Sequence, residues 1–162
     1  MDGTRFLPDE SGSTERPDLI QVLGSITFVN TGLFMALYSL MFLSMLVLRQ
    51  MPVDEFVASI SDSAALYLPK ENLGEMESIA RLLHAHGVLL MAIYLARTVL
   101  RFIGALGMWR GRRSGFHLYA AAQFVGLFAP HIVLPWSMLG VFGPLLTVAV
   151  TAMYGSQLKR MQ

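Results

Sequence analysis

Two long stretches without a charged residue constrain the fold of this chain more than any other feature. No Asp, Glu, Lys or Arg occurs between residues 21 and 48, and none occurs between residues 114 and 158. A helix needs about 20 apolar residues to cross a hydrocarbon core of roughly 30 Å. The first stretch therefore fits one membrane span and the second fits two. A third apolar stretch, at about 82–109, is interrupted only by Arg97 and Arg101.

These stretches predict an all-α fold, an integral membrane four-helix bundle. Hydrophobic types make up 54% of the 162 residues and charged types only 14%, whereas a soluble domain usually has about a quarter charged residues. Few polar residues would remain to cover a soluble surface. The predicted parts are a tail at 1–21, a transmembrane domain at 22–158 with spans at about 22–48, 82–109, 115–135 and 138–158, an extracytoplasmic loop at 49–81, and a C-terminus at 159–162.

The basic and acidic residues of the connections predict the topology. Arg110, Arg112 and Arg113 lie in the short loop between the second and third spans, and Lys159 and Arg160 follow the fourth. Loops rich in Lys and Arg stay in the cytoplasm. With four spans, both termini are then cytoplasmic, and the expected location is the bacterial inner membrane. The opposite loop carries six acids and one internal base, which are Asp54, Glu55, Asp62, Glu71, Glu75, Glu77 and Lys70.

The predicted extracytoplasmic loop contains one helical pattern. Its apolar residues recur at helical spacing, whereas its acids fall elsewhere on the wheel. This pattern predicts a short amphipathic helix, and the lack of a basic face favours a cap on the bundle over a lipid-binding helix. The tail at 1–21 is expected to be a mobile segment or a docking arm. The apolar positions of the amphipathic pattern are Val53, Phe56, Val57, Ile60 and Ala64.

Small residues indicate which helix faces pack together. Helices in lipid associate through close van der Waals contact, which small side chains allow. Such residues recur every four positions in the last two predicted spans. We expect these ridges to pack within one bundle, with self-association or a partner subunit as the alternative. The ridges consist of Gly143, Thr147, Thr151 and Gly155 in the fourth span, and Ala122 and Gly126 in the third.

Arg97 and Arg101 are the most informative residues of the sequence. They lie twelve and eight residues before Trp109, or about 18 and 12 Å at a rise of about 1.5 Å per residue, and their spacing places them on one helix face. A cation near the bilayer centre costs on the order of 2.5 to 3.5 kcal/mol. No predicted span contains an acid that would balance this charge. Neutral polar residues at similar depth predict a polar layer made of Asn30, Tyr94, Gln123, Thr151 and Tyr154.

Three interpretations of the arginine pair remain open from the sequence. The side chains can extend to the cytoplasmic headgroups, as long basic side chains near helix ends do. They can bind an anionic ligand such as a lipid headgroup or a fatty carboxylate, because a guanidinium group suits a carboxylate or phosphate. They can also meet a carboxylate from the membrane helix of a partner protein.

Histidines provide a weaker hypothesis of a metal or haem site. His84 and His86 lie near one end of the second span, and His131 lies near the matching end of the third. A spacing of two places His84 and His86 on nearly opposite faces of a helix, whereas ligands on one face come three or four residues apart. The chain also has no cysteine, so a thiolate site and a disulfide framework are excluded. No metal or other cofactor is predicted.

Two segments carry a family resemblance. The run from Gly107 to Tyr119, GMWRGRRSGFHLY, is followed by Gln123, and residues 25–32 read SITFVNTG. The first resembles the junction of the second and third helices of small, uncharacterised four-span bacterial inner-membrane proteins, and the second resembles the start of their first span. The resemblance implies a four-span fold and a membrane location, and it implies no activity.

The functional prediction from the sequence is a non-catalytic membrane subunit or scaffold of a membrane protein assembly. No phosphate-binding loop, nucleophile motif or pair of carboxylates within a span points to an enzyme. The alternative is a binder or carrier of an anionic lipid or amphiphile that uses Arg97 and Arg101, and a haem or metal-binding protein is a third hypothesis. Expected partners are membrane lipids and another membrane protein or a second copy. Nucleic acid is not expected, because the net charge is only +1.

Overall fold

Helices form most of the structure, a computed structural model that describes residues 6–67, 69 and 73–162. The described residues contain no strand, so the all-α prediction is confirmed for them. Residues 1–5 of the predicted tail and residues 68 and 70–72 of the predicted loop, which include Lys70 and Glu71, lie outside the described residues. The helices are α1 (Asp18–Leu48), α2 (Val53–Ala65), α3 (Leu73–Trp109), α4 (Arg113–Phe128) and α5 (Phe142–Gly155), with the 3-10 turns η2 (Ala129–Ile132), η3 (Trp136–Leu139) and η4 (Leu158–Arg160).

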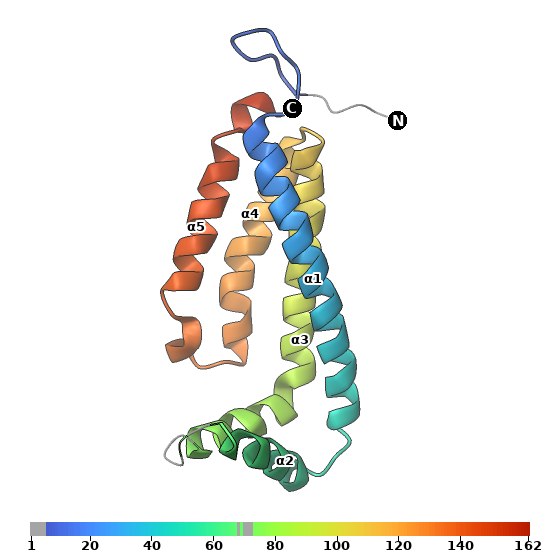
Figure 1. The fold of residues 1–162 in the computed structure, drawn as a ribbon, viewed down its shortest axis with the longest axis vertical. Coiled ribbons are helices and arrows are strands. Elements are labelled where there is room, and N and C mark those ends of the chain that lie inside the picture. The colour runs from blue at the N-terminus through green and yellow to red at the C-terminus, as the bar shows by residue number, and fades with distance from the viewer. Residues whose placement is uncertain (1–5, 68, 70–72) are drawn as a thin grey trace.

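Four of the helices run along the long axis of the molecule (Figure 1). Helix α3 packs on α1 and on α4 to a similar extent, while α5 lies beside α4 and meets α1 only sparsely. Both chain ends and the α3–α4 turn lie at one end of the bundle, which we call the termini end (Figure 1). Helix α2 lies at the other, which we call the α2 end. Helices α1 and α5 are therefore the neighbouring pair with the least contact.

Helices α1 and α3 are long and apolar enough to cross a membrane, judged by length and composition. Their 31 and 37 residues correspond to about 46 and 56 Å of helix. Many apolar side chains of α1 are exposed in the isolated chain; Val29, for example, is 75% exposed and Leu33 is 66% exposed. A core helix of a soluble protein would bury this surface. Helix α1 therefore lacks the burial of such a core helix.

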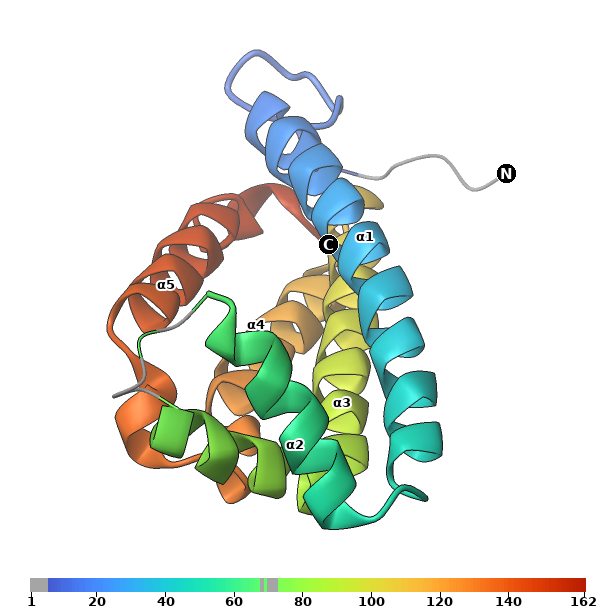
Figure 2. The ribbon, with the colours of Figure 1, turned by 60° about the horizontal axis from the view of Figure 1, so that its bottom comes forward.

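The predicted amphipathic helix is present as α2, and it packs on the start of α3. Phe56 and Val57 are buried against Ala80 of α3, which gives the helix a covered apolar face. Helix α3 begins at Leu73, nine residues before the predicted span at about 82–109. The added turns of α3 bend away from the bundle axis and lie across its end with α2 (Figure 2). Contact with α2 thus stabilises this segment as a helix, although its hydropathy predicted a loop.

The last two helices are shorter than the predicted spans at 115–135 and 138–158. Helix α4 ends at Phe128 and continues as the 3-10 turn η2, where Pro130 has no N–H to donate to an α-helical bond. Helix α5 covers Phe142–Gly155 only. Gly140 has a φ of +62° in the turn before it, a left-handed conformation that favours glycine. The backbone conformations at Pro130 and Gly140 therefore make the connection between α4 and α5 longer than hydropathy predicted.

The closest backbone approach joins α3 and α4 at glycines. A Cβ on Gly107 would lie 2.7 Å from the Cα of Gly115, and one on Gly115 would lie 2.5 Å from the nitrogen of Met108. These glycines let the two helices meet directly after the α3–α4 turn. Neither Gly107 nor Gly115 was predicted as a packing residue, although the two lie symmetrically on either side of the turn.

The predicted small-residue ridges differ in their surroundings. Ala122 and Gly126 of α4 are buried, and so are Thr147 and Thr151 of α5. Gly143 does not pack against a neighbouring helix, because a Cβ at this position would meet nothing within 4 Å. The α5 ridge is therefore interrupted where α5 borders the pocket described below. Gly155, the last member, faces the ring of Phe116.

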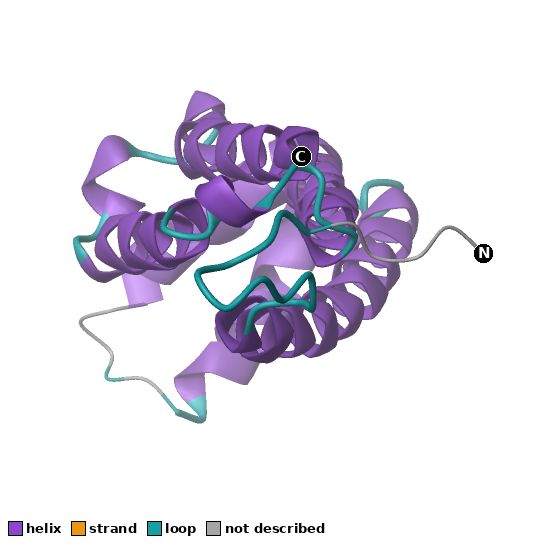
Figure 3. Ribbon diagram, turned by 90° about the horizontal axis from the view of Figure 1, so that it is seen from above, coloured by secondary structure: helices purple, strands orange, loops and turns teal. Residues whose placement is uncertain are grey.

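The N-terminal segment is docked on the C-terminus of the same chain. Arg160 donates from Nε to the carbonyl of Leu7 (2.8 Å) and from Nη1 to the Oδ2 of Asp9 (2.9 Å). Its Nη2 donates to the carbonyls of Ser13 (3.1 Å) and Glu15 (3.0 Å). We call this set of contacts the Arg160 clasp. It lies at the termini end, where the loop before α1 is also found (Figure 3). The tail was expected to be either a mobile segment or a docking arm, and residues 6–17 are docked.

Asp9 is the anionic member of the Arg160 clasp. Its pKa is lowered from 3.8 to about 2, chiefly because the hydroxyl of Ser11 donates to its carboxylate, with further help from the backbone of Ser13 and the charge of Arg160. The pKa is depressed in the folded chain, so the contribution of Asp9 to docking is complete above about pH 4 and is lost as the pH falls toward 2.

Candidate functional site

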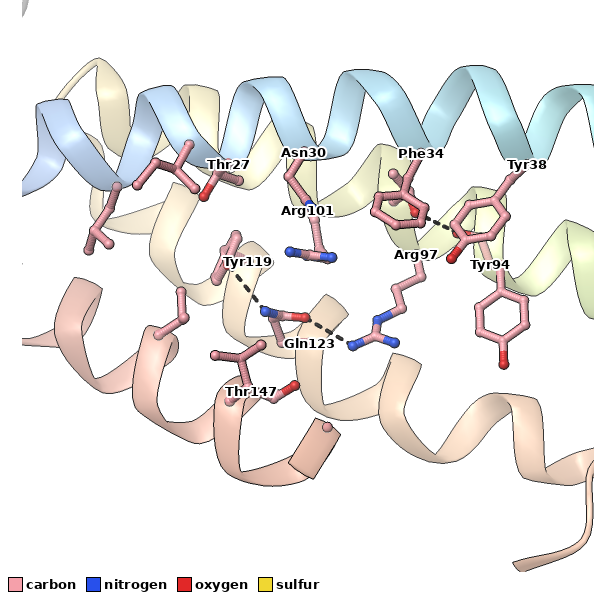
Figure 4. Close-up of a pocket in the computed structure, with 16 residues that line it drawn as sticks. Thr27, Asn30, Phe34, Tyr38, Tyr94, Arg97, Arg101, Tyr119, Gln123 and Thr147 are labelled. Atoms are coloured by element: carbon pink, nitrogen blue, oxygen red, sulfur yellow. Dashed lines mark hydrogen bonds between the residues drawn. The ribbon is translucent and has the colours of Figure 1, made fainter. Parts of the chain in front are cut away.

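A pocket of about 430 Å³ lies between α1, α3, α4 and α5, and it contains both arginines of the predicted polar layer. We call it the arginine pocket. Figure 4 shows its lining side chains. The two guanidinium groups turn into the pocket, instead of extending along α3 as the first interpretation of the sequence requires (Figure 4). The lining combines a polar centre with apolar walls from Leu23, Ile26, Phe34, Leu146 and Val150.

Gln123 holds Arg97 in place from the neighbouring helix. The Nη2 of Arg97 donates to the Oε1 of Gln123 at 3.1 Å, and the Nε2 of Gln123 donates to the hydroxyl of Tyr119 at 3.1 Å. Gln123 and Tyr119 are both buried and lie one turn apart on α4. The amide is therefore fixed on both sides, and it orients the guanidinium group of Arg97.

Most guanidinium donors of the pair have no partner. The Nε atoms of Arg97 and Arg101 are buried and unpaired among the described residues. Arg101 approaches the ring of Tyr119, with its Cζ 5.9 Å from the ring centre, a cation–π distance. A guanidinium group has five N–H donors, and burying such donors without acceptors is costly. The pocket therefore offers strong hydrogen-bond donors to an acceptor that enters from outside.

The charge of the pair is also uncompensated. Two ion pairs occur among the described residues, Arg81–Asp54 and Arg160–Asp9, and neither involves the pocket. The sequence has no Asp or Glu after Glu77, so α4, α5 and the greater part of α3 carry no carboxylate. None of the lining residues is acidic. The pocket holds two positive charges that no described residue neutralises.

The structure brings five of the seven predicted ligand-binding residues to this pocket. Asn30 of α1 lies close to Arg101 in the close-up, and Tyr94 stacks on Tyr38 with ring centres 5.4 Å apart (Figure 4). The lining residues among the predicted set are Asn30, Tyr94, Arg97, Arg101 and Gln123.

The other two predicted residues, Thr151 and Tyr154, lie outside the pocket lining. The hydroxyl groups of Tyr154 and Thr27 are 2.9 Å apart and form a bridge between α5 and α1. Thr151 is buried and its hydroxyl has no partner among the described residues.

A smaller cavity of about 180 Å³ adjoins the arginine pocket and shares Tyr94, Arg97, Gly143 and Thr147 with it. The aliphatic stem of Arg97 crosses over Gly126 of α4, where a Cβ would collide with its Cγ at 2.5 Å. Glycine at this position therefore leaves the space that the Arg97 side chain occupies. Gly126, predicted only as a packing residue, also shapes the site.

The histidines are not gathered into a site. The Nε2 of His84 lies 2.9 Å from the carbonyl of Met51, and the Nδ1 of His131 lies 3.1 Å from the carbonyl of Pro135. His86 is exposed. Within residues 6–67, 69 and 73–162, no group of three or more His, Asp or Glu side chains is placed to hold a metal ion. The candidate metal set His84, His86 and His131 therefore does not form such a group.

Several lining residues were not predicted as members of the site, among them Thr27, Phe34 and Tyr119. Tyr119 lies four residues before Gln123, so helical spacing alone could have linked the two. Phe34 likewise lies four residues after Asn30. Thr27 carries no local signal, because its role comes from contact with α5.

No protein-family model matches this chain, and neither a curated protein nor a solved structure is similar to it at a significant level. The resemblance to small four-span membrane proteins therefore stays a prediction.

Proposed function

We propose that this chain is an integral membrane protein that binds an anionic amphiphile in the arginine pocket. The observation that carries the proposal is the presence of two guanidinium groups in one pocket, each with a buried Nε that has no partner among the described residues. Guanidinium groups bind carboxylates and phosphates with short, charge-assisted hydrogen bonds. An amphiphile is favoured over a water-soluble anion because the walls of the pocket are largely apolar.

The proposed setting is a bilayer crossed by four helices, α1, α3, α4 and α5, with both termini in the cytoplasm. The length of α1 and α3 and the exposed apolar surface of α1 support this setting. Arg110, Arg112, Arg113 and Lys159 belong to the termini end and the acids of α2 to the opposite end, as the preference of basic loops for the cytoplasm requires. We place the protein in the bacterial inner membrane.

The proposed topology can be tested with cysteine labels, because the natural chain has none. Ser156→Cys marks the termini end and Ser63→Cys marks α2, and both serines are exposed. In intact spheroplasts, a membrane-impermeant maleimide should label Ser63→Cys and should label Ser156→Cys only after lysis. The reverse pattern, or labelling of both sites in intact spheroplasts, would contradict the topology.

A subunit of a larger assembly is the competing function, with a carboxylate of the partner opposite the arginines. The shape of the pocket favours the amphiphile. Four helices of this one chain line the pocket, and its volume of about 430 Å³ is too small for a helix about 10 Å across. A partner carboxylate would need to reach the guanidinium groups from outside the bundle, whereas an amphiphile can insert its headgroup and leave its chain in the lipid.

Native mass spectrometry of the protein, extracted gently from its own membrane, tests the proposal. We expect one anionic amphiphile per chain, retained by the wild type and lost from the Arg97→Gln/Arg101→Gln variant. The matched control is Arg110→Gln/Arg112→Gln, which removes two exposed arginines of the α3–α4 turn and should keep the bound molecule. Stoichiometric binding of another membrane protein that the pocket variant loses would instead support the subunit function. A bare wild-type chain would contradict both.

A further inference from the structure

We infer that the headgroup bound in the arginine pocket is a phosphate monoester carried on an apolar chain. The inference rests on the proposed function and deepens it, because an anionic amphiphile can also be a carboxylate. The charge of the pocket is the first argument. Arg97 and Arg101 contribute two positive charges, and no acidic residue lines the pocket. A carboxylate would neutralise one of them, whereas a phosphate monoester carries close to two negative charges at pH 7.

The arrangement of donors is the second argument. Arg97 has one donor committed to Gln123, and its Nε is free, while Arg101 makes no hydrogen bond to a described residue and its Nε is buried. A carboxylate has two oxygens, which a single guanidinium group can satisfy in a bidentate pair. A phosphate monoester has three terminal oxygens, so it can accept from both guanidinium groups at once. Asn30 of α1 lines the same pocket and adds a neutral amide donor to it (Figure 4).

The position of Gln123 supports a shared ligand for the two arginines. Gln123 contacts the guanidinium group of Arg97 directly and lines the same pocket as Arg101. Its Oε1 accepts from Arg97 and its Nε2 donates to Tyr119, so it adds no negative charge. Two like charges on adjacent turns repel each other. A dianion between them removes this repulsion, and a monoanion removes only part of it.

The apolar wall between α1 and α5 indicates how the chain of the ligand leaves the pocket. Ile26 of α1 and Leu146 of α5 line the pocket and are 61% and 53% exposed. These helices are bridged by Thr27 and Tyr154 toward the termini end, and elsewhere they meet only sparsely. A headgroup at Arg97 and Arg101 can thus project its chain between Ile26 and Leu146 into the surrounding lipid. A free phosphate would make no use of this wall.

The test compares ligands that share one acyl chain and differ in headgroup. Purified protein in an uncharged detergent is titrated with lysophosphatidic acid, the matching fatty acid, lysophosphatidylcholine and inorganic phosphate, and binding is measured by calorimetry. We expect lysophosphatidic acid to bind at least about tenfold more tightly than the fatty acid, as expected for one additional charge-assisted contact. Lysophosphatidylcholine, whose phosphate is a diester, and inorganic phosphate should bind at least about tenfold more weakly than lysophosphatidic acid.

A charge variant sharpens the test. Arg101→Gln leaves one cation in the pocket, so the preference for lysophosphatidic acid over the fatty acid should collapse toward equality. Arg112→Gln, which removes an exposed charge, should leave the preference unchanged. The comparison of ligands on the wild-type protein decides the question even if Arg101→Gln does not fold.

Each remaining outcome has one meaning. Equal affinity of the wild type for lysophosphatidic acid and the fatty acid would overturn the phosphate inference and leave the proposed function standing. Binding of inorganic phosphate as tight as that of lysophosphatidic acid would overturn the requirement for an apolar chain. Failure of both anionic amphiphiles to bind would overturn the inference and count against the proposed function, which native mass spectrometry tests separately with the natural lipids.

Discussion

The Arg160 clasp and the arginine pocket use the same side chain in opposite ways. Arg160 directs its donors to three carbonyls near it from Leu7, Ser13 and Glu15, and it pairs with the carboxylate of Asp9 at 2.9 Å. In the pocket, Arg97 has one hydrogen bond and Arg101 has none with a described residue. An arginine that holds the fold together has its acceptors supplied by its own chain. The free donors of Arg97 and Arg101 indicate that their acceptor comes from outside.

The largest expected effect is the loss of ligand affinity in Arg101→Gln. Hydrogen bonds to a charged group contribute about 1.5 to 3 kcal/mol, which corresponds to roughly 10- to 150-fold in affinity. The free energy of unfolding of the ligand-free protein should change little or increase, because an unpaired buried charge is removed. Calorimetry and thermal unfolding measure the two quantities. A large loss of stability with unchanged affinity would assign Arg101 a structural role and break the comparison.

Arg160→Gln should show the opposite pattern. Removing the ion pair with Asp9 and the contacts to the N-terminal segment should release that segment, at a cost of about 1.5 to 3 kcal/mol of docking free energy. Limited proteolysis of the segment before α1 should become faster, while the affinity for the amphiphile should stay within about twofold. Arg112→Gln is the control for loss of a basic residue at the same end. Unchanged proteolysis would show that the clasp does not hold the segment.

Gly126→Ala tests the Arg97 side of the pocket with a single methyl group. The added Cβ would occupy the space of the Arg97 stem, so this side chain must shift. We expect roughly a 3- to 10-fold loss of affinity, because the guanidinium group would leave its position beside Gln123. Gly32→Ala is the matched control on α1, where a Cβ meets nothing within 4 Å and the residue lies outside the pocket lining. Equal effects of the two substitutions would indicate that the position of Arg97 is unimportant.

The smallest expected effect concerns Asp9 in the Arg160 clasp. Ser11→Ala removes the hydroxyl that contributes most to the low pKa of Asp9, so this pKa should rise from about 2 toward 3.8. Release of the N-terminal segment on acidification should then begin at a higher pH than in the wild type. Nuclear magnetic resonance of the Asp9 side chain gives the pKa directly. An unchanged value would mean that the backbone of Ser13 and the charge of Arg160 are sufficient.

The positions of the helices were largely predictable from the sequence, but the residues at which the helices begin and end were not. Hydropathy located α1 and the central part of α3, and helical spacing located α2, because these signals are local. The start of α3 at Leu73 was not predictable, because that segment is stabilised by contact with α2 rather than by its own hydropathy. The end of α4 depends on Pro130 and the start of α5 follows the turn at Gly140, so both depend on backbone chemistry that a hydropathy window does not record.

Several residues of the candidate site were predicted from the sequence, but their arrangement in space was not. The spacing of Arg97 and Arg101 determined that they share a face, and the absence of acids from the four predicted spans determined that no span balances their charge. Only the tertiary structure decided that Gln123 accepts from Arg97 and that Asn30 lines the same pocket, while Tyr154 turns to Thr27. The physical reason is that contacts between helices depend on the rotation and spacing of each helix. These are set by close packing at residues such as Gly107 and Gly115, whereas the apolar pattern specifies only that the helices exist.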